Sequence, residues 1–295
     1  MQPGIEQTRE GLLSQGYVAD RALATTVHLA LALEKPMLVE GAAGVGKTEI
    51  AKALAGWLGS DLIRLQCYEG LDVHTALYEW NYQKQLLRIR LEGDSADPAD
   101  VERTIYGPEY LLERPLLQAI RSEDRVVLLI DEVDRADEEF EAFLLEVLSD
   151  FQISVPELGT IEARTRPVVV LTSNGTRELS DALRRRCLYF WIDYPDADTE
   201  LAILRSRLPD VKEATARDVV GLVQGLRAER LSKPPGIAET IDFVSAIEAM
   251  GAESVDGETV SAALGALVKD PADFAALDRS RIDSLLRPDA DPPEA

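Results

Sequence analysis

Residues 41–48 of this 295-residue chain read Gly41-Ala42-Ala43-Gly44-Val45-Gly46-Lys47-Thr48. They fit the pattern G-x-x-x-x-G-K-[ST], in which glycines let backbone N–H groups curl around phosphate oxygens. The lysine of such a loop supplies positive charge to the β and γ phosphates, and the hydroxyl of the last residue ligates Mg²⁺. An apolar run at 37–39 precedes the loop and a helical pattern at 47–58 follows it, which is the context the pattern requires. The octapeptide therefore predicts a site for the phosphates of a nucleotide.

Short apolar runs alternate with helical patterns around and beyond this loop. The run Val126-Val127-Leu128-Leu129-Ile130 shows no polar alternation, which suits a strand buried on both faces of a parallel sheet. Amphipathic patterns at 47–58 and 138–148 predict helices between strands. Further strands are expected at 61–67, 168–171 and 188–192. We therefore expect an α/β domain over residues 1–195, with a short N-terminal helix and a parallel sheet flanked by helices.

After Pro195 the pattern turns wholly helical, and it predicts a smaller all-α domain over residues 196–287. Residues 288–295 are expected to form a disordered acidic end. Residues 69–105 are the least legible part, and within them 86–91 fits either a strand or the end of a helix. A helix is expected at 110–120, and two short strands between Phe151 and Thr165.

Polar side chains follow two of the expected core strands. Asp131 and Glu132 come directly after the run 126–130. A carboxylate at the end of a buried strand is costly unless a cation meets it, so we expect Asp131 to face nucleotide-bound Mg²⁺. Glu132 is then placed to orient or activate the attacking water, although two exposed acids would give the same sequence. Asn174 follows the strand 168–171, and it either approaches the γ-phosphate and the water or is an ordinary turn residue.

Arg184, Arg185 and Arg186 stand together just before Cys187. Three adjacent side chains point three ways, so they are unsuited to crowding one phosphate of their own site. One of them, reaching a neighbouring subunit's nucleotide, would supply positive charge as the transition state develops. The alternative interpretation is a solvated basic patch.

Charge and cysteine content exclude several classes of function. The chain has 53 acidic and 31 basic residues, a net charge of −22 that is spread along its length. Such a charge opposes non-specific binding to nucleic acid and docking on anionic lipid, and it indicates a solvated surface or one matched to a basic partner. Cys67 and Cys187 lack metal-site spacing and are expected to be buried free thiols. With no basic or apolar leader in the first residues, we expect a cytoplasmic protein.

The loop, Asp131-Glu132, Asn174 and the arginine triplet occur in the order typical of AAA+ ATPases, a family that the chain resembles from about residue 15 to 285. The resemblance implies that Lys47 and Thr48 are the Walker A pair and that Asp131 and Glu132 form Walker B. Asn174 is then sensor 1, and Arg186 is the arginine finger, with Arg185 as the fallback. ATP and Mg²⁺ are the implied cofactors, Mg²⁺ being held through Thr48 and Asp131. The implied nucleotide-binding set is Gly41, Ala42, Ala43, Gly44, Val45, Gly46, Lys47, Thr48, Glu49 and Asp131.

Within this family the chain resembles the MoxR group, in which a hairpin comparable to 151–165 precedes the sensor 1 strand. The strings RLQCYEGLD at 64–72 and YEWNYQKQLL at 78–87 resemble the CoxD branch more narrowly. That resemblance implies a chaperone-like ATPase that remodels an apo-metalloenzyme, molybdenum-containing carbon monoxide dehydrogenase, so that sulfur and copper can enter its active site. It also implies a homo-hexameric ring, a partner with a von Willebrand factor A domain, and at most peripheral association with a membrane.

One departure from the family pattern concerns the helical lid. The helix expected to carry the sensor 2 arginine begins PPGIAET at 234–240 and contains none. Either Arg227, Arg230 or Lys233, just upstream, substitutes for it, or the contact is absent. The aromatic residues Tyr68, Tyr78, Trp80 and Tyr82 also stay open between a core role and client contact.

Two other functions share the same motifs. A DNA-directed AAA+ protein predicts a basic groove, which the charge of −22 opposes. A scaffold gated by nucleotide would bind ATP without useful hydrolysis, and the presence of Glu132 and Asn174 argues against it.

Overall fold

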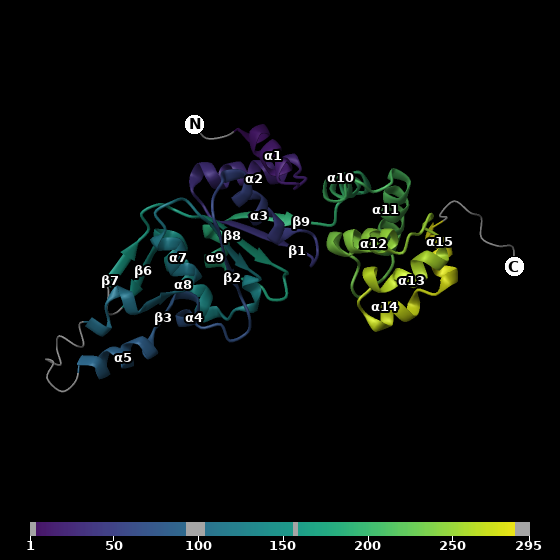
Figure 1. Cartoon of the computed structure of the whole chain (residues 1–295). Helices are drawn as coiled ribbons and strands as arrows, with labels where there is room; N and C mark the ends of the chain where they lie inside the picture. Colours follow the sequence, from purple (N-terminus) through teal and green to yellow (C-terminus); the bar gives the residue numbers. More distant parts are fainter. Residues whose placement is uncertain (1–3, 93–103, 156–158, 287–295) are drawn as a thin grey trace. The chain divides into compact units, whose positions relative to one another are not determined.

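The computed structural model describes residues 4–92, 104–155 and 159–286 (Figure 1). Its contacts divide the described chain into two compact units. The first comprises residues up to 11, 21–40 and 51–191, and the second comprises 12–20, 41–50 and residues from 192 onward. The domain limits at 195 and 287 stay a prediction, because the contacts group the glycine-rich loop with the later helices.

A five-stranded sheet forms the core of the α/β part, and its strands follow the order β2-β5-β8-β1-β9. The pairs β2–β5, β5–β8 and β8–β1 are parallel. Every residue of β1, β5 and β8 is buried, which explains the apolar runs at 37–39, 126–130 and 168–171 that make up most of these strands. The expected fold class is confirmed. The strands are β1 (Met37–Gly41), β2 (Leu62–Gln66), β5 (Val127–Asp131), β8 (Val168–Ser173) and β9 (Leu188–Ile192).

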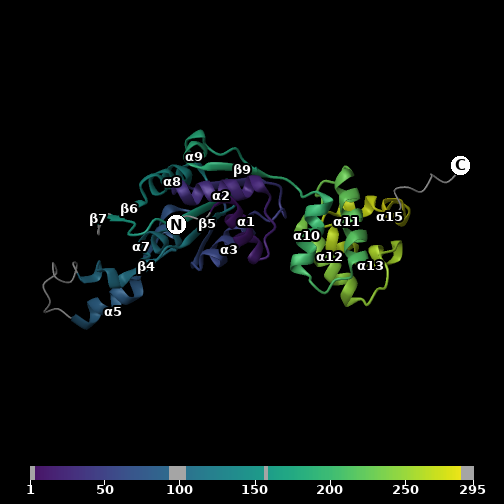
Figure 2. The same cartoon turned by 90° about the horizontal axis from the view of Figure 1, so that it is seen from above.

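Helices lie on both sides of this sheet (Figures 1 and 2). Helix α8 (Glu138–Asp150) begins where the Asp137 carboxylate accepts a hydrogen bond from the Phe140 N–H at 2.8 Å. It buries Phe140 and Leu144 against the sheet core, as the helical spacing predicted. Other helices of this part are α1 (Ile5–Ser14), α2 (Arg21–Leu33), α3 (Lys47–Leu58), α7 (Pro115–Arg121) and α9 (Asp181–Arg186).

Between β2 and α7 the chain makes an excursion whose secondary structure the sequence pattern did not predict. It contains α4 (Val73–Leu77), β3 (Tyr78–Trp80), α5 (Tyr82–Glu92), a 3₁₀ turn (Pro108–Tyr110) and β4 (Leu111–Glu113). Strands β3 and β4 pair antiparallel, so the predicted helix at 110–120 is wrong in its first half. Residues 86–91, for which the sequence fitted either a strand or the end of a helix, form the later part of helix α5.

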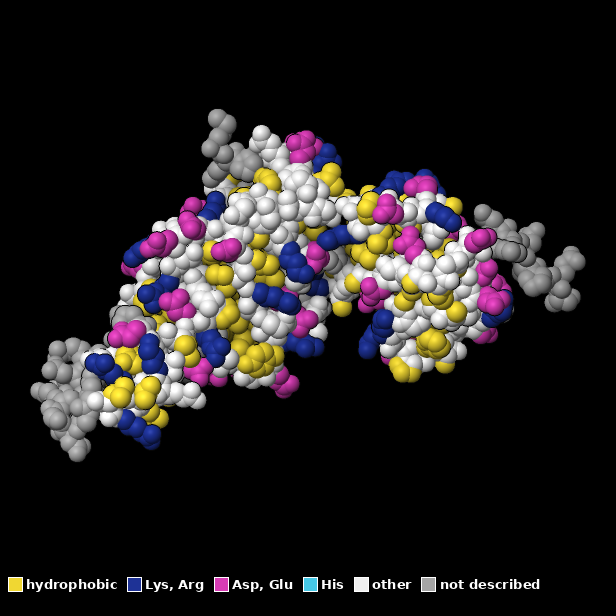
Figure 3. All heavy atoms as spheres, in the orientation of Figure 1, with side chains coloured by type: hydrophobic (Ala, Val, Ile, Leu, Met, Phe, Trp, Pro, Cys, Tyr) yellow, Lys and Arg dark blue, Asp and Glu magenta, His cyan; other side chains and the backbone are white. Residues whose placement is uncertain are grey.

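The aromatic residues of this excursion divide between core and surface. Tyr78 and Trp80 are buried in the main hydrophobic core, whereas Tyr82 is 63% exposed and Tyr68 46% exposed. Helix α5 also exposes Leu86, Leu87 and Leu91, and Figure 3 shows basic side chains among these apolar ones. Of the four aromatic residues, Tyr78 and Trp80 therefore belong to the core, and Tyr68 and Tyr82 do not.

The remaining paired strands are β6 (Gln152–Val155) and β7 (Gly159–Glu162), which pair antiparallel as expected for 151–165. Cys67 is buried and Cys187 only partly so, and burial raises the pKa of both thiols to about 12. Within the described residues, no helix combines the length and the apolar character needed to cross a membrane.

The chain after β9 is helical, as predicted. Six helices follow β9 within the described residues. Their core includes Val223, Phe243 and Leu264, each almost wholly buried. The helices are α10 (Ala197–Arg207), α11 (Glu213–Ala228), α12 (Ile237–Ala249), α13 (Gly257–Leu267), α14 (Pro271–Ala276) and α15 (Arg279–Leu286). The predicted acidic end at 288–295 lies outside the described residues.

A buried ion pair fastens the first three of these helices together. Arg227 donates from both terminal nitrogens to the two oxygens of Glu200, each at 2.7 Å. Glu200 has no exposed surface, and it also accepts hydrogen bonds from Thr240 and Gln224 at 2.8 Å. The Arg227 Nε donates to the Pro235 carbonyl at 2.8 Å. Because every charged atom has a partner, the desolvation of both ions is offset.

Replacing Arg227 with methionine should strongly destabilise the helical region. The change leaves Glu200 charged, buried and without its cation, which lowers the free energy of unfolding by about 3–5 kcal/mol. Urea unfolding followed by circular dichroism measures the loss. Arg217→Met on the same helix is the control, because Arg217 pairs on the surface with Glu213. If Arg227→Met costs no more stability than Arg217→Met, the buried pair is not what holds these helices.

Candidate active site

Three neighbouring strands end at one edge of the sheet and carry the residues that the sequence singled out. Because β5, β8 and β1 are adjacent and parallel, their carboxyl ends meet at the same edge. Asp131 ends β5, Ser173 ends β8, and Gly41 ends β1 and begins the glycine-rich loop. The carboxyl edge of an open α/β sheet is where such folds bind ligands.

The backbone of the loop explains two of its glycines. Gly44 and Gly46 have φ of 77° and 91°, conformations that a residue with a Cβ rarely adopts. Lys47 begins α3, and its Nζ donates to the carbonyls of Gly41 at 2.8 Å and Ala42 at 2.6 Å. The ammonium group therefore lies within the loop, next to the N-terminus of a helix, where backbone N–H groups and the helix dipole favour an anion.

Thr172, which no sequence motif identifies, joins two residues at the end of β5 through hydrogen bonds. The Thr172 hydroxyl donates to Asp131 at 2.5 Å and accepts from the Glu132 N–H at 2.9 Å. Asp131 is almost wholly buried, and its other oxygen accepts from Arg64 at 2.6 Å. The cation that faces Asp131 in the structure is therefore the guanidinium of Arg64 from β2. Binding of nucleotide-bound Mg²⁺ by Asp131 stays a prediction.

Glu132 has an unusual backbone. Its φ of 55° and ψ of 50° are left-handed, a conformation that costs a residue other than glycine about 1–2 kcal/mol. The hydrogen bond to Thr172 helps to hold this turn. The side chain is one-third exposed, and its carboxylate lies 3.3 Å from the Nε of Arg135. Strained backbone of this kind concentrates at functional sites, and it turns Glu132 away from the direction in which β5 runs.

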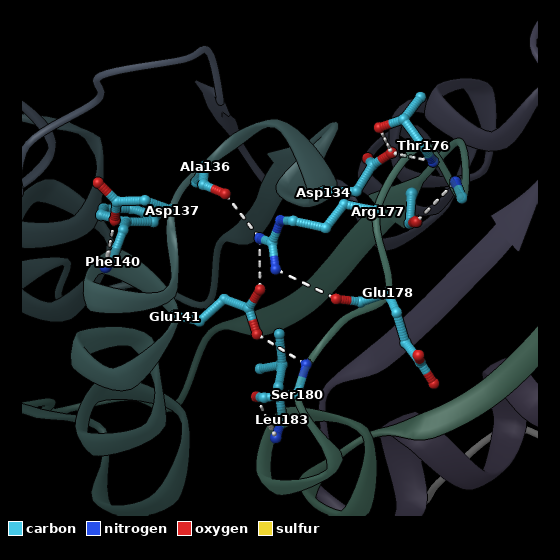
Figure 4. A network of polar contacts seen from close by, with 12 residues as sticks. Asp134, Ala136, Asp137, Phe140, Glu141, Thr176, Arg177, Glu178, Ser180 and Leu183 are labelled. Carbon is cyan, nitrogen blue, oxygen red and sulfur yellow. Dashed lines mark hydrogen bonds and ion pairs between the residues drawn. The ribbon is translucent and has the colours of Figure 1, made fainter.

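Asp134 fixes the position of the loop that contains Asn174. Its carboxylate accepts from the Asn174 N–H at 3.2 Å. It also accepts from the Thr176 N–H at 2.9 Å and the Thr176 hydroxyl at 2.6 Å (Figure 4). Burial alone would raise the pKa of Asp134, but these hydrogen bonds outweigh it and the pKa is lowered. The buried charge thus ties the segment after β5 to the segment after β8.

A second buried carboxylate connects the same region to α9. Glu141 on α8 lies 2.5 Å from the guanidinium of Arg177, and it accepts from the Ser180 N–H at 2.9 Å. Arg177 also donates to the Ala136 carbonyl at 2.6 Å. Ser180 in turn caps α9 by accepting from the Leu183 N–H (Figure 4). The start of α9 is thereby attached to α8, and no spacing or motif predicts this pairing.

The arginine triplet ends α9, and its side chains take different partners. Arg184 donates to the Glu40 carboxylate at 3.2 Å. Arg186 is exposed, and it donates to the Ser149 hydroxyl at 2.6 Å and the Ala182 carbonyl at 3.0 Å. Arg185 is exposed on the same turn. The trans role expected of Arg186 or Arg185 stays a prediction.

The three basic residues that could replace the sensor 2 arginine differ in their surroundings. Arg227 is occupied by Glu200, whereas Arg230 and Lys233 are exposed. At the start of α12, the Ile237 N–H donates to the Gly44 carbonyl of the loop at 2.9 Å. Glu49, expected in the nucleotide-binding set, pairs with Arg207 at 2.7 Å. Arg227 is therefore best described as a structural residue that supports the loop before α12.

A glycine-rich loop with Lys47 at the end of one parallel strand, and acids at the end of another, defines a P-loop nucleotide-binding protein. Residues 37–192, more than half of the chain, match the model of the family described as "ATPase family associated with various cellular activities (AAA)". The chain belongs to this family and is an ATP-binding P-loop ATPase, a class for which Mg²⁺ is the usual companion ion.

Several curated proteins are similar over part of the chain. Chaperone protein ClpB 1 of Nostoc sp. is 30% identical over 177 residues, which are 59% of this chain and 16% of that protein. Probable chaperone protein ClpB 1 of Chlorobaculum tepidum is 29% identical over 171 residues, 57% of this chain and 33% of that protein. The chain thus spans only about a sixth to a third of these relatives.

Solved structures support the fold. A mutant of Thermotoga maritima RuvB has a TM-score of 0.53 at 19% identity, covering 92% of this chain and 76% of that one. A second RuvB mutant has a TM-score of 0.51 at 18% identity, covering 94% and 76%. At these identities the likeness concerns the fold alone.

Replacing Thr172 with valine should impair hydrolysis more than nucleotide binding. Valine keeps the shape but removes both hydrogen bonds that join Asp131 and the Glu132 N–H, which lowers stability by about 1–3 kcal/mol. We expect kcat to fall about tenfold or more, with the Kd for ATP nearly unchanged. Steady-state ATPase kinetics and binding of a fluorescent ATP analogue measure the two. Thr165→Val is the control, since that exposed hydroxyl bonds only the Glu123 carbonyl. Equal kcat in the two variants would contradict this role for Thr172.

Proposed function

We propose that the chain uses ATP hydrolysis to remodel a protein client, as one subunit of a ring. The observation that carries the proposal is the shared edge at which β1, β8 and β5 end, because Gly41, Ser173 and Asp131 are the last residues of these adjacent parallel strands. Support for a protein client comes from the similarity to two proteins that are named chaperones.

The residues divide the work of hydrolysis. Backbone N–H groups of the loop and the Lys47 ammonium bind the phosphates, and Thr48 with Asp131 would hold Mg²⁺, which supplies charge neutralisation at the phosphate oxygens. Glu132 accepts a proton from the attacking water, and Asn174 orients that water against the γ-phosphate. The left-handed backbone of Glu132 and the Asp134 bonds to the Asn174 loop fix both groups before ATP arrives, so less reorganisation is needed in the transition state.

An arginine supplied by the adjacent subunit completes the site in this proposal. Arg186 and Arg185 lie exposed at the end of α9, where a neighbour can be reached. Arg186 already has a bond to Ser149 on α8, which orients its guanidinium. We favour Arg186, as the resemblance implies, with Arg185 as the fallback.

Mixing two inactive variants tests the trans arginine and the ring together. Arg186→Ala and Glu132→Gln should each reduce kcat by about 10³-fold, with ATP still bound. An equimolar mixture should regain activity, because an interface between the two subunits can pair an intact Glu132 with an intact Arg186. Arg164→Ala serves as the control at an exposed arginine. If the mixture stays inactive while Arg185→Ala mixtures recover, Arg185 is the finger; if neither recovers, no trans arginine of α9 acts.

The narrower proposal concerns the client. The resemblance of residues 64–72 and 78–87 to the CoxD branch supports an apo-form of molybdenum-containing carbon monoxide dehydrogenase, into which sulfur and copper are inserted, with a von Willebrand factor A domain protein as partner. Another protein client, DNA and a scaffold role are the alternatives. The charge of −22 argues against DNA, and tight, salt-sensitive binding of a duplex would favour it.

A client trap tests this proposal. Glu132→Gln should bind ATP without turnover and hold purified apo-carbon monoxide dehydrogenase in an ATP-dependent complex, measured by size-exclusion chromatography. Lys47→Ala, which loses the phosphate charge, should form no such complex. The wild-type protein with ATP, sulfide and copper should restore carbon monoxide oxidation. An apo-enzyme that neither binds the trap nor stimulates ATPase activity would remove it as the client and leave the ATPase assignment intact.

A further inference from the structure

We propose that Glu40 is a positioning residue of the ATPase, which couples the start of the glycine-rich loop to the Asn174 loop and to the arginines of α9. The proposal rests on the ATPase activity and is independent of the client. Glu40 acts through other residues, because its carboxylate is committed to protein partners.

Glu40 is a carboxylate in a position that packing alone would give to an apolar residue. It is the fourth residue of β1, after Met37, Leu38 and Val39, and only 4% of its surface is exposed. A buried charge is weak support for stability, since an apolar side chain of similar size usually serves at least as well. The alternative use of a buried ion pair is to fix one arrangement among several. The partners of Glu40 are consistent with that use.

One partner belongs to the loop that contains Asn174. Ser173 lies opposite Glu40 in the β1–β8 register, and its hydroxyl is 3.4 Å from the carboxylate. The same hydroxyl accepts from the Gly175 N–H at 3.0 Å, a bond that spans Asn174. Gly175 has a φ of 70°, so the chain turns sharply there. Glu40 and Ser173 thus hold this turn from the β1 side, while Asp134 holds it from the β5 side.

The other partner belongs to α9. The Arg184 guanidinium lies 3.2 Å and 3.4 Å from the two oxygens of Glu40 and stacks over the Tyr189 ring, with 5.7 Å to its centroid. Partial burial, and then the negative charge and hydrogen-bond acceptance of Glu40, raise the pKa of Tyr189. Because α9 has only six residues, anchoring Arg184 sets the rotation of the next two, Arg185 and Arg186.

The carboxylate therefore connects three elements at the residue immediately before Gly41. A shift of the loop on nucleotide binding or release moves the end of β1, and the Glu40–Arg184 pair transmits that shift to α9. The Asn174 loop moves together with the end of β1, because Ser173 joins the two. Loss of the pair should misplace Asn174 and the exposed arginines without removing the phosphate-binding groups of the loop.

A double-mutant cycle in the full chain tests this coupling. Glu40→Gln, Arg184→Gln and the double variant are compared for basal kcat, KM for ATP, binding of a fluorescent ATP analogue and Tm. We expect each single change to lower kcat about ten- to a hundredfold with KM within about threefold, because misplacement affects the transition state more than binding. The double variant should be no slower than the slower single variant, since both changes break one link. Arg184→Lys should retain part of the activity.

The matched control is the surface pair Arg166–Glu34, whose partners are 3.4 Å apart and exposed. Arg166→Gln and Glu34→Gln should leave kcat and KM unchanged. If Glu40→Gln fails to fold, Arg184→Gln carries the test from a position that is one-third exposed. The proposal is overturned if the folded variants keep wild-type kcat, if their only change is in Tm, or if the two single effects multiply in the double variant. Because no client is present, these results are separate from the client trap.

Discussion

The common edge of β1, β8 and β5 is the constraint on which the rest of the site depends. A parallel sheet sends every strand's carboxyl end to the same side, so backbone pairing brings together Gly41, Asp131 and Ser173, which are far apart in the sequence. The side chains then have little freedom, because all three strands are buried along their whole length. Buried carboxylates and a threonine hydroxyl join neighbouring segments across the strands. The edge is thus a connected polar layer on an apolar core.

This layer illustrates how buried charge can set geometry. Glu40, Asp131 and Asp134 are all nearly inaccessible, and each accepts hydrogen bonds from a different segment of chain. In a medium of low polarity an unsatisfied carboxylate is strongly unfavourable, so alternative arrangements of these segments are disfavoured. The helical region uses the same device at Glu200 and Arg227. In both units, buried acids thus hold particular segments of the chain together.

Much of the fold could be predicted because the relevant signals are local. The apolar run at 126–130 and the glycine pattern at 41–48 each describe one element and its immediate neighbours. Hydrogen bonds such as Thr172 with Asp131, or Arg177 with Glu141, join residues about 40 positions apart, and no spacing in the sequence announces them. The half-wrong helix at 110–120 shows the same limit, since residues 111–113 become a strand only because β3 lies beside them. A carboxylate within the apolar strand of β1 was the one available signal for Glu40.

The left-handed backbone of Glu132 has a consequence for how this protein balances two demands. A glycine would adopt that turn without strain, and the chain would be the more stable for it. It would also have no carboxylate there. A glutamate at this turn therefore costs some stability, and in the proposed function it supplies the carboxylate that accepts a proton from the attacking water. Selection for stability alone would therefore favour a glycine at this position.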